Sequence, residues 1–134
     1  MMQFIRSRPS FACFALMAGL AAAPAAAQKT PDFRGAAFAM QGGEAVYQGV
    51  CQGCHMADAK GATGAGTYPA LANNPKLASS GYVLTMVMNG NKGMPPFGEQ
   101  FTDQQVTDVV NYVRTHFGNR FKGMVKEADV KALR

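Results

Sequence analysis

Residues 51–55 read Cys-Gln-Gly-Cys-His, and the rest of the chain is best interpreted around this stretch. On a helix, side chains three and four positions apart share one face, so Cys51, Cys54 and His55 are expected to project together. Two thiols and one imidazole on the same face can hold a single flat group. Because three reactive side chains within five residues form a specific signal, the motif is the starting point for predicting the site.

The Cys-x-x-Cys-His spacing is typical of covalent attachment of a c-type haem. The sequence therefore predicts one haem c, bound through thioether bonds to Cys51 and Cys54, with His55 reaching the iron. A zinc site is one alternative, but it needs further ligands at metal-binding spacing, and the only other histidine is His116. A thioredoxin-like dithiol is another, but it would follow a strand, and none is expected before Cys51.

The first 27 residues are expected to be an export signal. Two arginines precede the apolar run 11–23, which is too short to span a membrane, and residues 25–27 supply small side chains for cleavage. The mature chain would then begin at Gln28 and lie in the periplasm; an uncleaved membrane anchor is the alternative. Cys13 would leave with the signal, so no disulfide is expected within the mature chain.

Residues 28–134 suffice for one small domain. We expect an N-terminal arm over 28–41, the domain over 42–118 and a tail over 119–134, which either folds as a short helix over the domain or docks on a partner. A small core without a disulfide often needs another support, and a buried haem would supply it. The formal net charge is +5, but basic residues do not form a stripe interleaved with aromatic ones, so nucleic-acid binding is not expected.

Helical periodicity predicts a first helix that begins near Gly42 and delivers both thiols at its end. Gly43 has no side chain, which would allow another helix to cross closely there. The residues expected on the buried face of this helix are Gly43, Tyr47, Val50, Cys51 and Cys54.

Two further helices are expected. One is capped by Ser79 or Ser80 and ends near Gly90. The other begins at Thr102, which forms a capping box with Gln105, and ends at Gly118. The buried faces expected for them are Val83, Met86, Val87 and Gly90 in the first, and Val106, Val109, Val110, Val113 and Phe117 in the second. Tyr112 is expected to pack against the first helix near Gly43 and Tyr47.

Two loops carry candidate cofactor-binding residues. A metal-bound histidine usually donates its other N–H to a carbonyl or carboxylate, and the Pro69 carbonyl is a candidate partner for His55, although an ordinary turn proline is the alternative. Met94 lies on a proline-stiffened loop, which suits a thioether held at a fixed distance from iron. Loop packing is the alternative for Met94, and the other methionines near these segments are Met56, Met86 and Met88.

With these pieces in order, the chain resembles the class I cytochrome c family over roughly residues 42–118. The softer motifs at the end of the last helix and in the tail are similar to monohaem cytochrome subunits of periplasmic dehydrogenases. The family often has glycine where this chain has Tyr68. The motifs that carry the resemblance are Gly43-x-x-x-Tyr47, Cys51-x-x-Cys54-His55, Pro69-x-Leu71, Gly93-Met94-Pro95 and the aromatic helix around Tyr112.

The resemblance implies an all-α cytochrome c fold, with three to five helices wrapped around one covalently bound haem. It implies His55 as the proximal and Met94 as the distal iron ligand, which leaves no open position for catalysis. The expected function is one-electron transfer in the periplasm, from a dehydrogenase towards a terminal oxidase, with no small-molecule substrate. A small haem enzyme or gas-binding haem protein with a displaceable sixth ligand is the alternative.

The expected partners are redox proteins: a periplasmic dehydrogenase, a terminal oxidase or another cytochrome. Such partners form small, weak interfaces that are steered by charge. Lys60, Lys76 and Lys92 flank the proposed haem-facing loops and are candidates for guiding an acidic partner. An ordinary solvated surface explains these lysines equally well.

Overall fold

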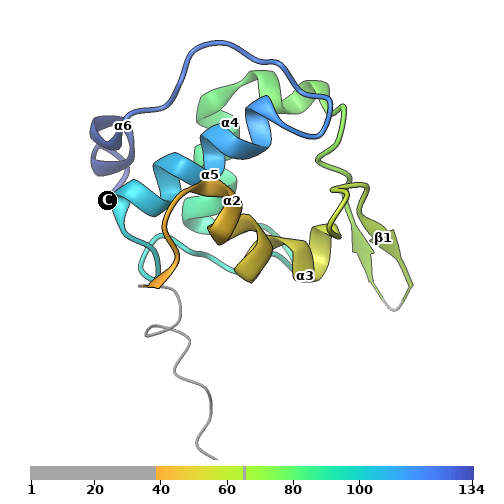
Figure 1. The fold of residues 1–134 in the computed structure, drawn as a ribbon. Coiled ribbons are helices and arrows are strands. Elements are labelled where there is room, and N and C mark those ends of the chain that lie inside the picture. The colour runs from red at the N-terminus through yellow and green to blue at the C-terminus, as the bar shows by residue number, and fades with distance from the viewer. Residues whose placement is uncertain (1–38, 65) are drawn as a thin grey trace, which may run out of the picture.

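The structure, a computed structural model, describes residues 39–64 and 66–134, so the expected export signal and most of the expected arm lie outside the described residues. The described chain is mostly helical, with one small hairpin (Figure 1). Its elements are α2 Gly43–Val46, the π-helix η1 Tyr47–Cys51, α3 Gln52–His55, β1 Ala62–Thr63, β2 Thr67–Tyr68, the 3-10 helix η2 Pro75–Ala78, α4 Ser80–Asn89, α5 Asp103–Thr115 and α6 Glu127–Lys131. Among the helices of these residues, none has the length and apolar character needed to cross a membrane.

The first helix is present as expected, but it contains one wide turn. α2, η1 and α3 follow one another without a break, and η1 is a π-helix in the middle. A π turn holds more residues than an α turn, so it rotates the positions that follow it. Val46 and Tyr47 are buried, whereas Cys54 is exposed. Of the other residues on the expected buried face, Gly43, Val50 and Cys51 are half-buried.

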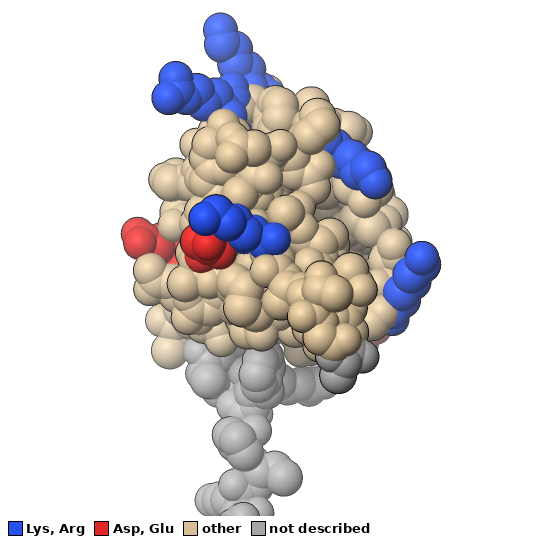
Figure 2. All heavy atoms as spheres, turned by 90° about the vertical axis from the view of Figure 1, so that its right-hand side faces the viewer, with Lys and Arg blue, Asp and Glu red and all other residues tan. Residues whose placement is uncertain are grey.

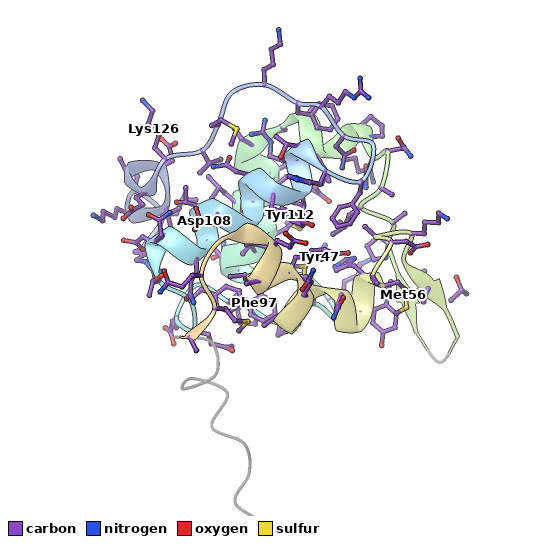
Figure 3. The ribbon with its side chains drawn as sticks, in the orientation of Figure 1. Tyr47, Met56, Phe97, Asp108, Tyr112 and Lys126 are labelled. Atoms are coloured by element: carbon purple, nitrogen blue, oxygen red, sulfur yellow. The ribbon has the colours of Figure 1, made fainter. Side chains whose placement is uncertain are left out.

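The first helix and α5 cross at Gly43, as expected. A Cβ atom at Gly43 would lie 2.5 Å from the Cβ of Tyr112, and closer still to the Asp108 carbonyl oxygen. Next to the crossing, the rings of Tyr47 and Tyr112 pack with their centroids 5.8 Å apart. Figures 1 and 3 show α2 lying across α5 at this point. The expected contact of Tyr112 with Tyr47 is confirmed.

The capping box of α5 is also confirmed. The Thr102 hydroxyl accepts a hydrogen bond from the Gln105 backbone N–H at 3.2 Å, and the Gln105 side chain accepts one from the Thr102 N–H at 3.0 Å. The four valines of the expected stripe, Val106, Val109, Val110 and Val113, are buried. The helix ends at Thr115, before the expected stop at Gly118.

Helix α4 begins as expected but buries a different face. The Ser79 hydroxyl accepts a hydrogen bond from the Tyr82 N–H at 3.3 Å. Beyond Val83, the buried residues are Leu84 and Met88 in place of Met86 and Val87, which are half-buried. At Met88 a tertiary contact contributes: the segment after Pro96 returns to the end of α4, where the Gly98 N–H donates to the Met88 carbonyl at 3.1 Å. Periodicity does not reveal which face such a segment will cover.

The glycine-rich stretch after His55 forms a small hairpin. β1 and β2 pair antiparallel, with Ala62 opposite Tyr68 and Thr63 opposite Thr67. The described residues are therefore mostly helical, with two short strands beside the helices. Strands of two residues are too short to produce an alternating pattern, so the sequence offered no signal for them.

The tail over 119–134 packs on the domain. Val125 and Val130 are buried, and α6 lies against α5. Arg114, which is 1% exposed, ties the tail to η2. Its guanidinium donates to four backbone carbonyls, those of Leu77 at 3.0 Å, Ala78 at 3.3 Å, Lys122 at 2.9 Å and Gly123 at 2.5 Å. Of the two alternatives for the tail, the structure shows the first, a short helix folded over the domain.

We expect Gly43→Ala to destabilise the domain, because its methyl group would push α2 away from α5. Overpacking of this kind typically costs about 1–3 kcal/mol. Denaturant unfolding of the purified protein measures the loss. Gly81→Ala is the matched control and should not destabilise the domain. A Cβ atom at that helical position meets nothing within 4 Å, and alanine is a better helix former than glycine. Equal stabilities of the Gly43→Ala variant and the wild type would contradict the close crossing.

Candidate functional site

The imidazole of His55 is buried and oriented by one hydrogen bond. His55 is the last residue of α3 and is 8% exposed. Its Nδ1 lies 2.9 Å from the Pro69 carbonyl oxygen, the partner proposed from the sequence. A carbonyl carries no hydrogen, so Nδ1 must be the donor. In the neutral ring this leaves Nε2 with a free lone pair, as a metal ligand requires.

Pro69 reaches His55 because the chain folds back tightly on itself. A Cβ atom at Gly61, which has a φ of +70°, would lie 2.8 Å from the Pro69 carbonyl carbon and 2.9 Å from the Ala70 nitrogen. The buried carbonyl of Ala59 accepts from the N–H groups of Leu71 and Ala72 at 2.8 and 2.9 Å. The segment after β2 is therefore held against residues 59–61, and its Pro69 carbonyl is delivered to the imidazole.

Both cysteines of the motif are free thiols. Cys51 is half-buried and Cys54 is exposed. Burial raises the pKa of Cys51 to about 12, and the neighbouring Cys54 adds to this effect. Cys51 is therefore a neutral thiol at physiological pH. Neither sulfur is committed to a disulfide, so both are available for bonds to another group.

A strained residue follows His55 directly. Met56 has φ 67° and ψ 160°, a combination that is essentially restricted to glycine and costs about 1–3 kcal/mol in other residues. Its N–H donates to the Gln52 carbonyl at 2.9 Å, and its own carbonyl accepts from the Tyr47 hydroxyl at 2.7 Å. Figure 3 shows Tyr47 in the first helix and Met56 just beyond α3. Sequence reasoning missed this contact, because nothing in a methionine signals a positive φ.

Met94 lies on the loop between α4 and α5. The residue is half-buried and packs against the hydrophobic core, as Cys51 does. Its backbone N–H donates to the Asn91 carbonyl at 2.9 Å, and its carbonyl accepts from the Asn91 N–H at 3.0 Å. The expected placement on an irregular, proline-containing loop is correct. Its expected role as an iron ligand stays a prediction.

The second histidine lies elsewhere on the surface. His116 is exposed just after α5, where its ring stacks on Tyr112 at a centroid distance of 4.1 Å. Within residues 39–64 and 66–134, no group of three or more His, Cys, Asp or Glu side chains could hold a metal ion.

The donor set fits a haem c. Two free thiols can form thioether bonds, and a buried imidazole with a free Nε2 can bind iron. A thioether is available from Met94 on a loop that packs against the same core. Haem c is attached through sulfur atoms and its iron is bound by nitrogen, and the motif supplies both kinds of donor.

The fold and the motif together define a cytochrome c domain. The family described as "Cytochrome C oxidase, cbb3-type, subunit III" matches residues 38–113, more than half of the sequence, and the chain belongs to this family. The resemblance drawn from the sequence is therefore confirmed. The match ends within α5, so it does not include the tail.

The curated relatives are cytochrome subunits of dehydrogenases. The chain is 35% identical over 106 residues to the gluconate 2-dehydrogenase cytochrome c subunit of Pantoea cypripedii, covering 70% of this chain and 24% of that protein. It is 31% identical over 105 residues to the alcohol dehydrogenase (quinone) cytochrome c subunit of Gluconacetobacter polyoxogenes, covering 69% and 22%. It is 34% identical over 92 residues to the fructose dehydrogenase cytochrome subunit of Gluconobacter japonicus, which covers 58% of this chain and 19% of that protein. The chain thus spans a quarter or less of these relatives.

We expect Tyr47→Phe to weaken the domain at neutral pH, because it removes the hydrogen bond to Met56. A lost bond of this kind costs about 1 kcal/mol. Burial raises the pKa of Tyr47 to about 12 from its ordinary 10.0, with smaller contributions from Cys51, Tyr112 and Asp58. The unfolded wild type therefore releases the phenolic proton first, and Tyr47 loses its stabilising effect as the pH rises from 10 towards 12.

Denaturant unfolding of the wild type and the Tyr47→Phe variant, at pH 7 and between pH 10 and 12, tests this expectation. The stability difference should be largest at pH 7 and should narrow at alkaline pH, since phenylalanine does not titrate. A difference that stays constant up to pH 12 would show that the Tyr47 hydroxyl is not held in the neutral form by the fold.

Proposed function

We propose that this chain is a periplasmic one-electron carrier with one haem c attached through Cys51 and Cys54. The observation that carries this proposal is the hydrogen bond from His55 Nδ1 to the Pro69 carbonyl. His55 is the last residue of the motif, and this bond leaves its Nε2 free for a metal. A haem held at this motif would supply reversible one-electron chemistry at its iron. The pattern of residues 1–27 supports export to the periplasm.

The chain's own residues would set the properties of the site. His55 Nε2 and the thioether of Met94 are the proposed ligands, and the hydrogen bond to Pro69 fixes the orientation of the ring. Methionine opposite histidine raises the reduction potential relative to two histidines. With both positions taken by side chains, the domain would carry electrons and would not bind a substrate at the metal.

The proposed partner is a dehydrogenase, from which electrons would pass towards a terminal oxidase. The relatives are named as cytochrome subunits of gluconate, alcohol and fructose dehydrogenases, which supports a donor of this kind. The face that Figure 2 displays is largely uncharged; basic side chains project at several places, and acidic side chains lie beside one of them. Lys76 and Lys92 are exposed, while Lys60 forms an ion pair with Asp58, with its Nζ 3.3 Å from Oδ2. Such a surface suits a weak, charge-steered contact with an acidic partner.

Haem attachment is tested with the exported, purified protein. We expect a pyridine haemochrome spectrum of haem c that survives acid extraction of non-covalent haem, and a reversible reduced-minus-oxidised spectrum. Changing both Cys51 and Cys54 to serine should abolish covalent haem, because serine forms no thioether. Cys13→Ser is the matched control and should retain full haem content. A colourless wild-type protein after correct maturation would rule out the proposal.

The ligand assignment is tested by Met94→Ala. We expect this variant to lose the weak charge-transfer band at the red end of the visible spectrum that marks methionine ligation of ferric haem, and to have a lower midpoint potential. Met86→Leu is the control on α4 and should keep the band. If the wild type lacks the band and binds cyanide freely, the alternative of a small haem enzyme or gas-binding protein replaces electron transfer.

A further inference from the structure

The loop that carries Met94 passes directly over Gly90. Gly90 follows α4 with φ 68° and ψ 177°, a conformation that is essentially restricted to glycine. A Cβ atom there would lie 2.8 Å from both the Pro95 carbonyl carbon and the Pro96 nitrogen, and closer still to the Met94 carbonyl oxygen. The backbone of residues 94–96 therefore occupies the space that a side chain at position 90 would need.

Few other backbone contacts hold this part of the loop. Asn91 and Met94 exchange two backbone hydrogen bonds, at 2.9 and 3.0 Å. Pro95 and Pro96 have no N–H to donate. Regular contact with α4 resumes only at Phe97, whose N–H donates to the Val87 carbonyl at 2.9 Å. Between these points, the Pro96 carbonyl accepts from the Gln100 side chain at 2.9 Å, and the backbone of residues 94–96 lies in close contact with Gly90.

The neighbouring glycine differs in this respect. Gly93 precedes Met94 directly and belongs to the Gly-Met-Pro motif, yet a Cβ atom there would meet nothing within 4 Å. Its φ also lies outside the left-handed range. A side chain therefore fits at Gly93, the glycine next to Met94, but not at Gly90.

We infer that Gly90 is a positioning residue for Met94, because the close seating of residues 94–96 on Gly90 fixes the height of the thioether above the core. A side chain at position 90 lifts this segment from the end of α4 and withdraws Met94 from the metal. The inference rests on the proposed function, since it requires Met94 to be the distal ligand of a bound haem.

The test compares Gly90→Ala with Gly93→Ala in the haem-loaded protein, using imidazole as the probe. Imidazole binds the ferric iron only when Met94 has left, so its apparent affinity reports the fraction of protein in the open state. Forcing alanine into the Gly90 conformation should open the loop enough to raise that affinity about tenfold or more. The charge-transfer band should weaken and the midpoint potential should fall. Gly93→Ala should match the wild type in all three measurements.

A double-mutant cycle shows whether Gly90 acts through Met94. Once Met94→Ala has opened the site, adding Gly90→Ala should change imidazole affinity no further. If Met94→Ala removes the band but Gly90→Ala leaves band and affinity unchanged, the inference is wrong and the proposed function stands. If Met94→Ala itself has no effect on the band, the ligand assignment fails and the inference fails with it.

A milder variant covers the case in which Gly90→Ala does not fold. Gly98 lies at the far end of the same loop, where a Cβ atom would be 2.9 Å from the Met88 carbonyl oxygen and 3.2 Å from the Met88 methyl carbon. Gly98→Ala therefore lifts the loop from α4 without imposing a left-handed φ. We expect a smaller increase in imidazole affinity in the same direction. An unchanged affinity in this variant would overturn the inference.

Discussion

The hydrogen bond between His55 Nδ1 and the Pro69 carbonyl is the interaction on which the site depends. It requires a carbonyl fourteen residues along the chain to return to the end of α3. That return is possible because the chain after β2 crosses Gly61 without a side chain between the two backbones. The orientation of the imidazole, the identity of its protonated nitrogen and the availability of Nε2 all follow from this one contact.

Close backbone approach is the common device of the structure. The first helix meets α5 at Gly43, the Pro69 segment crosses Gly61, and the Met94 segment crosses Gly90. In each case a glycine lies where a second backbone leaves no room for a Cβ atom. The three crossings seat the motif helix, the carbonyl partner of His55 and the loop of Met94, so each part of the donor set is placed by main-chain packing.

Several features could be predicted because they are local. The spacing of Cys51, Cys54 and His55, the capping box at Thr102 and the cap at Ser79 depend on residues a few positions apart. Other features failed because they depend on distant partners. The segment that returns at Gly98 bonds to the Met88 carbonyl at the end of α4, a contact that the periodicity of the helix does not indicate. The hydrogen bonds of the buried Arg114 side chain join η2 to the tail, and no local pattern in the sequence predicts them.

By itself, the sequence determined the class of this protein, since the Cys-x-x-Cys-His spacing is typical of cytochromes c and the family match confirms the class. It also placed Met94 on a stiff loop and named Pro69 as the partner of His55. Only the tertiary structure decided which glycines matter, that Met56 is held in a strained conformation by Tyr47, and that the tail covers α5. The physical reason is that these contacts join segments far apart in the chain, and their geometry exists only once those segments pack together.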